Sequence, residues 1–195
     1  MLSQVRPAIV STILFTLLLG VAYPLAITGV SRLAFPFQAG GSLLRDRSGK
    51  VIGSALIGQA FSRPEYLHPR PSAAGSGYDA SASSGSNYGP LNPDLAKRVK
   101  GDADALRASG LEPIPADAVT TSGSGLDPDI SPAYALLQTD RVAKARGGAP
   151  GQVRQVIASH VEGQWLGFIG QPHLNVLKTN LALDAAFAKA HPAGS

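Results

Sequence analysis

Residues Pro7 to Ser31 read P-A-I-V-S-T-I-L-F-T-L-L-L-G-V-A-Y-P-L-A-I-T-G-V-S, and this uncharged stretch of 25 residues decides the broad class of the fold. As an α-helix it would be about 37 Å long, and the hydrocarbon core of a bilayer is about 30 Å thick. A helix satisfies its backbone polar groups internally, as lipid requires. Tyr23 and Phe35 lie where interfacial aromatic residues are expected. The stretch therefore predicts an N-terminal transmembrane helix, which Pro24 would bend or unravel near its end.

A cleaved signal peptide is the alternative interpretation of this segment. Gly20-Val21-Ala22 has the small residues of a cleavage site, and Arg6 supplies the positive charge that precedes the apolar run. Apolar residues nevertheless continue as far as Val30, which a signal peptide does not need. The sequence therefore favours a retained anchor. The predicted divisions are a short tail over residues 1–6, a transmembrane helix over 7–31 and a single soluble domain over 32–195.

The flanking charges leave the orientation of this helix open. Arg6 and the terminal amine precede the apolar stretch, whereas Arg32, Arg45, Arg47 and Lys50 follow it. The enrichment of Lys and Arg on the cytoplasmic side would by itself favour a cytoplasmic soluble domain. A tail of six residues is a poor basis for either orientation.

Composition excludes several classes of function. The chain has 195 residues and a net charge of +4, with its 17 Lys and Arg residues scattered, so a nucleic-acid partner is not expected. It has no Cys, which excludes disulfides, thiolate zinc sites and cysteine nucleophiles. The four His residues do not have the spacing of a metal motif, and we expect the chain to bind no metal.

After the anchor, the pattern predicts a mainly helical soluble domain with a small β-hairpin, which is an α+β fold. Residues 40–59 place apolar runs on both sides of the turn sequence Asp46-Arg47-Ser48-Gly49, and the second strand is expected over 51–57. Gly53 interrupts that strand and indicates a bulge or the close approach of another segment.

Two helices begin with the same signal. Asn92-Pro93 and Ser131-Pro132 each combine a capping residue with proline at the first helical position. The first helix is expected to end at Gly110. The second is expected over 133–146, with Gly147 beyond its end.

Three further elements are expected toward the C-terminus. A helix from Gln152 carries a stripe that consists of Val153, Val156, Ile157, His160 and Val161. Residues 165–169 are expected to form a short strand. A last helix over 175–189 has a face formed by Leu177, Leu181, Ala185 and Ala188. Residues 177–183 also fit the alternation of a strand, so both assignments stay open there.

Two polar, glycine-rich segments are the candidate functional loops. Val119 to Pro132 reads V-T-T-S-G-S-G-L-D-P-D-I-S-P, which has too many turn residues for a core and too much pattern for a flexible linker. Arg70 to Pro93 is a second long loop, in which Tyr78 and Tyr88 indicate partial packing.

The first loop has two readings. It is a structural elbow that aims the helix after Ser131, or a nest of backbone N–H groups that accepts an anion, a partner carbonyl or a nucleotide phosphate. The G-x-S-x-G and phosphate-loop patterns are missing, and we predict no catalytic residue. The candidate nucleotide or partner contacts are Ser122, Gly123, Ser124, Gly125, Asp127, Gln138 and Arg141, with Tyr78, Asp79, Ser86 and Asn87 from the second loop.

A series of short blocks is spread over nearly the whole chain. They include Arg6-Pro7-Ala8, Gly53-Ser54-Ala55-Leu56-Ile57-Gly58-Gln59, His68-Pro69-Arg70-Pro71-Ser72, Tyr78-Asp79-Ala80, Ser122-Gly123-Ser124-Gly125-Leu126-Asp127-Pro128, Arg141-Val142-Ala143 and Asn180-Leu181-Ala182-Leu183-Asp184. In this order they resemble the C subunit of the potassium-transporting Kdp P-type ATPase. Several ordered blocks are far more specific than one motif.

The resemblance implies a non-catalytic accessory subunit of a high-affinity, ATP-driven potassium uptake pump in the bacterial inner membrane. Its implied partners are a channel-like A subunit, an ATP-hydrolysing B subunit, a small F peptide and the lipid bilayer. It implies a catalytic chaperone that raises the ATP affinity of the B subunit, with ATP as a shared ligand. It also implies a periplasmic soluble domain. Because ATP is cytoplasmic, a periplasmic domain would have to act on ATP binding through the membrane or indirectly.

Two other classes of function remain as alternatives. One is a membrane-anchored envelope hydrolase that uses a loop serine, and labelling of Ser122 or Ser124 by a serine-reactive probe would identify it. The other is an envelope binding module that acts without any pump. The chain contains no phosphorylatable D-K-T-G motif, so it is not the ATP-hydrolysing motor of a P-type pump.

Overall fold

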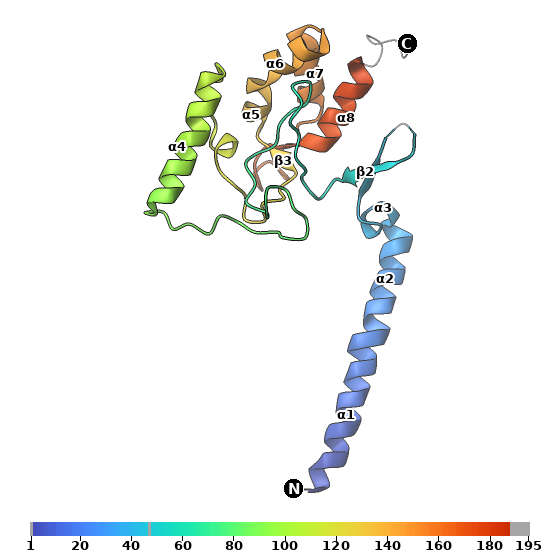
Figure 1. Cartoon of the computed structure of the whole chain (residues 1–195). Helices are drawn as coiled ribbons and strands as arrows, with labels where there is room; N and C mark the ends of the chain where they lie inside the picture. The colour runs from blue at the N-terminus through green and yellow to red at the C-terminus, as the bar shows by residue number, and fades with distance from the viewer. Residues whose placement is uncertain (1, 47, 188–195) are drawn as a thin grey trace. The chain divides into compact units, whose positions relative to one another are not determined.

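The computed structural model describes residues 2–46 and 48–187 (Figure 1). The chain divides between Leu43 and Leu44 into two compact units, which are described separately. The fold class is α+β, as predicted, with an apolar N-terminal helix, further helices and a small antiparallel hairpin.

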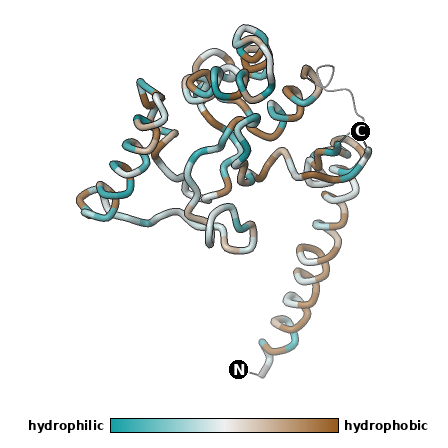
Figure 2. Tube along the Cα trace, turned by 45° about the horizontal axis from the view of Figure 1, so that its top comes forward, coloured by the Kyte–Doolittle hydropathy of each residue, from teal (hydrophilic) through white to brown (hydrophobic). Residues whose placement is uncertain are grey.

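The first unit is dominated by a 30-residue apolar helix, Val5–Ala34, with a mean hydropathy of 2.1. Its length and composition make it a candidate membrane span. Figure 2 shows hydrophobic residues along most of this helix. Its elements are η1 (Leu2–Gln4), α1 (Val5–Leu17), the π-helical η2 (Leu18–Ala22) and α2 (Tyr23–Ala34), followed by α3 (Pro36–Ala39).

Pro24 does not unravel the end of this helix, so that one of the two expected effects is wrong. Helical structure continues through α2 to Ala34. The irregularity instead lies in the π-helical turn Leu18–Ala22, directly before the proline. A widened turn accommodates the missing proline N–H and the bulk of the ring, which removes the need to break the helix.

The predicted hairpin is present as β1 (Leu43–Arg45) and β2 (Val51–Ser54). The Asp46 carboxylate accepts from the backbone N–H of Ser48 at 2.8 Å and of Lys50 at 3.0 Å, which fixes the turn. The second strand ends at Ser54 rather than Ile57, because the Ser54 hydroxyl accepts from Leu56 N and starts a turn.

Gly53 marks a close approach, as predicted. A Cβ atom at this position would lie 2.8 Å from Leu177 Cδ2 and 3.3 Å from Gln59 Nε2. The absence of a side chain therefore lets the strand pack against the last helix.

The second unit contains five α-helices in the described residues. They are α4 (Pro93–Ala108), α5 (Pro132–Leu137), α6 (Thr139–Arg146), α7 (Pro150–Ser159) and α8 (Val176–Phe187), with the short 3-10 helix η3 (Ala116–Ala118) before α5. Both predicted caps are confirmed: Asn92 Oδ1 accepts from Asp94 N at 2.8 Å, and Ser131 Oγ accepts from Tyr134 N at 3.0 Å.

The helix predicted over 133–146 is two helices. A turn at Gln138 separates α5 from α6, because Gln138 N bonds to Ala135 O in the tighter i to i−3 pattern. The left-handed Gly147 follows α6, as expected.

The segment after α7 differs from its prediction. The helix ends at Ser159, so His160 and Val161 lie beyond it. Residues 165–169 form a tight turn instead of a strand, closed by a single bridge between Trp165 and Ile169. Two consecutive residues at the turn have positive φ, which reverses the chain before a strand can extend.

The last helix is confirmed, but its predicted face is right only at Leu177. The buried positions of α8 are Val176, Leu177, Thr179, Asn180 and Leu183, whereas Leu181 is half-buried and Ala185 is exposed. Residues 188 and 189 lie outside the described residues. A different face of α8 points into the core because it carries Thr179 and Asn180. These two polar side chains are buried and have hydrogen-bond partners there.

A second two-stranded sheet ties the loop region to α8. Strand β3 (Asp129–Ile130) pairs antiparallel with β4 (Leu174–Asn175), and Asp129 faces Asn175. The main core lies around α5 to α8, which gather near β3 in Figure 1. Its most buried members include Leu67, Val142, Val153, Ile157, Leu174 and Leu183.

Candidate functional site

The two glycine-rich loops lie side by side. Ser84 N donates to Ser124 O at 2.9 Å, and the Ser83 hydroxyl donates to the same carbonyl at 3.0 Å. The Ser72 hydroxyl donates to Gly125 O at 2.6 Å. Segments that are 41 and 53 positions apart in the sequence thereby come together in the second unit.

The two glycines of the S-G-S-G motif have different roles. Gly125 has a φ of +66°, and a Cβ there would lie 2.5 Å from Ser84 O and 2.7 Å from Ala74 N. A Cβ on Gly123 would have no described atom within 4 Å. Gly125 is therefore required by packing and backbone conformation, whereas Gly123 faces open space.

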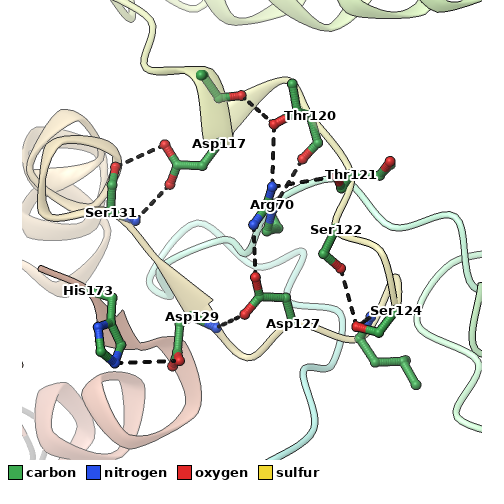
Figure 3. A network of polar contacts seen from close by, with 12 residues as sticks. Arg70, Asp117, Thr120, Thr121, Ser122, Ser124, Asp127, Asp129, Ser131 and His173 are labelled. Atoms are coloured by element: carbon green, nitrogen blue, oxygen red, sulfur yellow. Dashed lines mark hydrogen bonds and ion pairs between the residues drawn. The ribbon is translucent and has the colours of Figure 1, made fainter. Parts of the chain in front are cut away.

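Arg70 lies at the centre of the polar network in Figure 3. Its Nη1 donates to Asp127 Oδ2 at 2.8 Å, and its Nε donates to Thr120 O at 3.2 Å. Longer contacts reach the Thr120 hydroxyl and Thr121 O. Arg70 belongs to the second loop, and its planar guanidinium therefore fixes the first loop at two positions, Thr120 and Asp127.

The start of α5 is capped by the chain's own side chains. Asp117 Oδ2 accepts from Ser131 N at 2.7 Å, and Asp117 Oδ1 accepts from the Ser131 hydroxyl at 2.9 Å (Figure 3). The Ser131 hydroxyl in turn accepts from Tyr134 N. A carboxylate already occupies the place where an external anion would bind, which favours the elbow interpretation of this loop.

Asp129 and His173 face each other beside this cap. His173 Nε2 lies 3.8 Å from Asp129 Oδ2, and Asn175 Nδ2 donates to Asp129 Oδ1 at 3.1 Å. Burial raises the pKa of Asp129, while His173 opposes that shift. An open pocket of about 520 Å³ is lined by Asp129 and His173 together with Arg70, Asp117, Asp127 and Ser131.

Of the two candidate serines, Ser124 is exposed and Ser122 is half-buried, and their hydroxyls face each other. The Ser122 and Ser124 hydroxyls are 3.4 Å apart, and Ser124 Oγ accepts from Leu126 N at 3.1 Å. These contacts stabilise the turn, and they do not activate either hydroxyl as a nucleophile. Asp127 stabilises the following turn, since its Oδ1 accepts from Asp129 N at 3.1 Å.

Tyr78 is tied to its own loop by two hydrogen bonds. Its hydroxyl donates to Arg70 O at 2.7 Å, and its backbone N–H donates to the Ser72 hydroxyl at 2.8 Å. Burial raises the pKa of the Tyr78 phenol. The predicted partial packing is thus confirmed for Tyr78. Tyr88 is also partly packed, because it is 44% exposed and the Arg98 guanidinium lies 5.8 Å from its ring centroid.

The remaining candidates of this loop make local contacts or lie at its surface. Asp79 Oδ1 accepts from Ser81 N at 2.9 Å and from the Ser81 hydroxyl at 2.6 Å. Ser86 is half-buried, and the exposed Asn87 adopts a left-handed φ of 53°.

Gln138 and Arg141 form a separate clamp. Gln138 Oε1 accepts from His68 N at 2.7 Å, and Gln138 Nε2 donates to His68 O at 3.1 Å. Arg141 Nη1 donates to Pro64 O at 2.7 Å and to Tyr66 O at 3.0 Å. Both side chains hydrogen-bond to the backbone of the segment that precedes Arg70. They therefore fix the segment that leads into the second loop and support the loops indirectly.

Several residues of this network were absent from the candidates that the sequence suggested, and three of them are ionisable residues from outside the first loop. They are Arg70, Asp117 and His173, which come from three distant parts of the chain. Arg70 had a signal, since it lies in the block His68-Pro69-Arg70-Pro71-Ser72. Within residues 2–46 and 48–187, the side chains of His, Asp and Glu do not assemble into a group that could hold a metal ion.

Comparison with known proteins gives consistent matches over nearly the full length. The family model described as KdpC, the c chain of K+-transporting ATPase, matches residues 5–185. A protein of Caulobacter sp. (strain K31) is 68% identical over 189 residues, with 96% of each chain covered. One of Beijerinckia indica subsp. indica is 60% identical over 195 residues, with 98% of each covered. One of Sorangium cellulosum is 53% identical over 190 residues, which cover 95% of this chain and all of the relative. All three are named potassium-transporting ATPase KdpC subunit.

Proposed function

The chain belongs to the KdpC family, the c chain of K+-transporting ATPases, and we propose that it stabilises the pump and supports ATP hydrolysis without catalysing a reaction itself. Membership makes it a membrane subunit of a bacterial potassium pump. The observation that carries the proposal is the match over residues 5–185, which includes both the apolar helix and the loop-bearing unit.

The proposed arrangement places residues 7–31 in the inner membrane and residues 32–195 in the periplasm. The apolar helix Val5–Ala34 supports the single span. The proposed partners are a channel-like A subunit, an ATP-hydrolysing B subunit and a small F peptide, with the lipid bilayer around the helix. In this arrangement the soluble part meets the pump on the side opposite to ATP.

The proposed contact surface is the pair of glycine-rich loops. Gly123 is exposed in the first loop, and Arg70 and Ser72 brace that loop by donating to Thr121 O and Gly125 O. A braced loop loses little conformational entropy when it binds, which favours recognition through exposed backbone groups. Asp127 and Tyr78 hold this shape from within, and Gln138 and Arg141 secure the segment that leads to it.

The proposed effect on the pump is an increase in the ATP affinity of the B subunit. Because the soluble part is placed outside the cytoplasm, the effect passes through the assembled membrane subunits. Direct ATP contact by the loops requires the opposite orientation. A reporter enzyme fused after Ser195 distinguishes the two routes, since a reporter active only in the cytoplasm would overturn the periplasmic placement.

The test uses the pump purified in mild detergent, with and without this chain. We expect the chain to copurify with the ATPase, and its removal to raise the apparent KM for ATP. Unchanged ATP dependence after removal would contradict the chaperone role. Recovery of the chain alone would contradict its role in assembly.

A glycine pair tests the loop surface. Gly123→Val adds bulk to the first loop at a position where a Cβ has no described neighbour within 4 Å, so we expect the chain to fold. Gly101→Val is the matched control, because Gly101 has equally open surroundings on α4. We expect only the loop variant to weaken copurification or raise the apparent KM for ATP. If both variants copurify equally well and show the same apparent KM for ATP, the loop is not part of the interface.

A further inference from the structure

An aromatic hairpin tip projects from the second unit after α7. Trp165 is 68% exposed, Leu166 67%, Phe168 73% and Ile169 45%. These four side chains, here called the apolar knob, lie within five consecutive positions. Single exposed apolar residues are ordinary on protein surfaces, but a contiguous group of this size marks an interaction site.

The knob is a hydrogen-bonded structure and not a frayed loop. Trp165 N donates to Ile169 O at 2.9 Å, and Ile169 N donates to Trp165 O at 2.9 Å. Gln164 Nε2 donates to Gly170 O at 3.0 Å. Lower down, Glu162 and His173 exchange two backbone hydrogen bonds of 2.8 and 3.1 Å, which root the hairpin beside β4.

Leu166 in this turn is not a residue that the turn conformation favours. Leu166 has a φ of 53° and Gly167 a φ of 80°, and the first of two such positions normally holds Asn, Asp or Gly. A leucine is disfavoured in this conformation, and at 67% exposure it gains little from packing inside this chain. Its presence at the tip is explained by a contact outside the chain.

Charge argues against a lipid surface as the occupant. The ten residues from Gly163 to Pro172 contain no Lys, Arg, Asp or Glu. Segments that bind anionic membrane surfaces combine apolar residues with Lys and Arg. The knob therefore fits an uncharged and apolar protein groove better than a headgroup layer.

Size argues against a second copy of this chain. Four large side chains at these exposures offer roughly 500 Å² of surface. A stable interface buries about 800 Å² on each partner. A contact this small holds only when the chain is already kept beside its partner, and membership of a membrane-bound pump together with an apolar anchor helix supplies that proximity.

We propose that the apolar knob docks into an uncharged, apolar groove on the exposed surface of another subunit of the same ATPase. The proposal rests on the assembly role given above. It adds a second contact point, distinct from the glycine-rich loops.

Photocrosslinking within the purified pump tests the contact directly. A photoreactive p-benzoylphenylalanine at position 168 keeps an aromatic ring in the knob, and the same group at position 91 is the control, because Leu91 is 96% exposed. We expect position 168 to crosslink to a residue of another pump subunit, identified by mass spectrometry. Crosslinks only to lipid, only to a second copy, or no more than at position 91 would overturn the proposal.

A pair of substitutions separates the apolar contact from the shape of the turn. Leu166→Asn suits the left-handed conformation and removes the apolar group, so we expect an unchanged melting temperature of the chain alone. Combined with Phe168→Ser, it should make the chain leave the pump about tenfold faster in detergent, whereas Leu91→Asn should not. If the double variant still copurifies with the pump and its release rate is unchanged, the docking proposal is overturned and the assembly role stands. A chain that never copurifies would overturn the assembly role as well.

Discussion

The guanidinium of Arg70 donates to the carboxylate of Asp127 at 2.8 Å, although 57 positions separate these residues in the sequence. The side chains are only 20% and 30% exposed, so solvent screens the pair less than a surface ion pair. Arg70 also donates to Thr120 O, which makes it a bracket between the two loops.

Breaking this bracket should destabilise the second unit. Arg70→Lys keeps the charge but lacks the planar fork, and Asp127→Asn removes the charge while keeping the size. We expect each to lower the free energy of unfolding by about 1–3 kcal/mol, measured by urea unfolding of the full chain in detergent. The double variant should cost less than the sum of the two single losses. Strictly additive losses would mean that the two groups do not interact.

Gly125 and Gly123 should respond differently to the same substitution. Gly125→Ala puts a Cβ against two backbone atoms at a positive φ, and we expect a loss of at least about 2 kcal/mol in unfolding free energy. Gly123→Ala meets open space and should stay within about 0.5 kcal/mol of the wild type. Thermal unfolding of both variants gives the comparison. Equal losses would contradict the packing role assigned to Gly125.

Local signals in the sequence were sufficient where the physics is local. The caps Asn92 and Ser131 and the close approach at Gly53 all depend on residue types that few other conformations favour. The apolar N-terminal helix was equally predictable, since length and hydropathy alone identify it.

Long-range pairing explains what the sequence concealed. Asn180 looks like a surface residue of α8, and only its contact with Leu67, 113 positions away, makes it an inner one. Asp117 likewise bonds to Ser131, the N-cap residue of α5, which lies 14 positions later. Tertiary contacts of this kind override the apolar periodicity from which the face of α8 was predicted.

Removing the Asn180 side chain should therefore be costly. Its Oδ1 accepts from Leu67 N at 2.8 Å, and its Nδ2 donates to Leu67 O at 3.0 Å, all within the core. Asn180→Leu leaves two buried backbone groups unpaired, and we expect a loss of about 2–4 kcal/mol in urea unfolding. Lys178→Ala, at a more exposed position of α8, is the control and should cost no more than about 1 kcal/mol. Similar losses for both would show that the amide bridge is not what stabilises this region.

The carboxyl of Asp129 should make stability depend on pH. Burial raises the pKa of Asp129 in the folded chain above its unfolded value of about 4, so the folded state binds this proton more tightly. The free energy of unfolding must then fall as pH rises from about 4 through the folded pKa. Asp129→Asn removes this term and can still accept from Asn175 Nδ2. We expect its melting temperature to exceed that of the wild type at about pH 7, and the difference to shrink at about pH 4. Asp140→Asn, whose native side chain is 81% exposed on α6, should show no such trend. A lower melting temperature of Asp129→Asn at about pH 7 would instead mean that the contact with His173 outweighs the cost of burial.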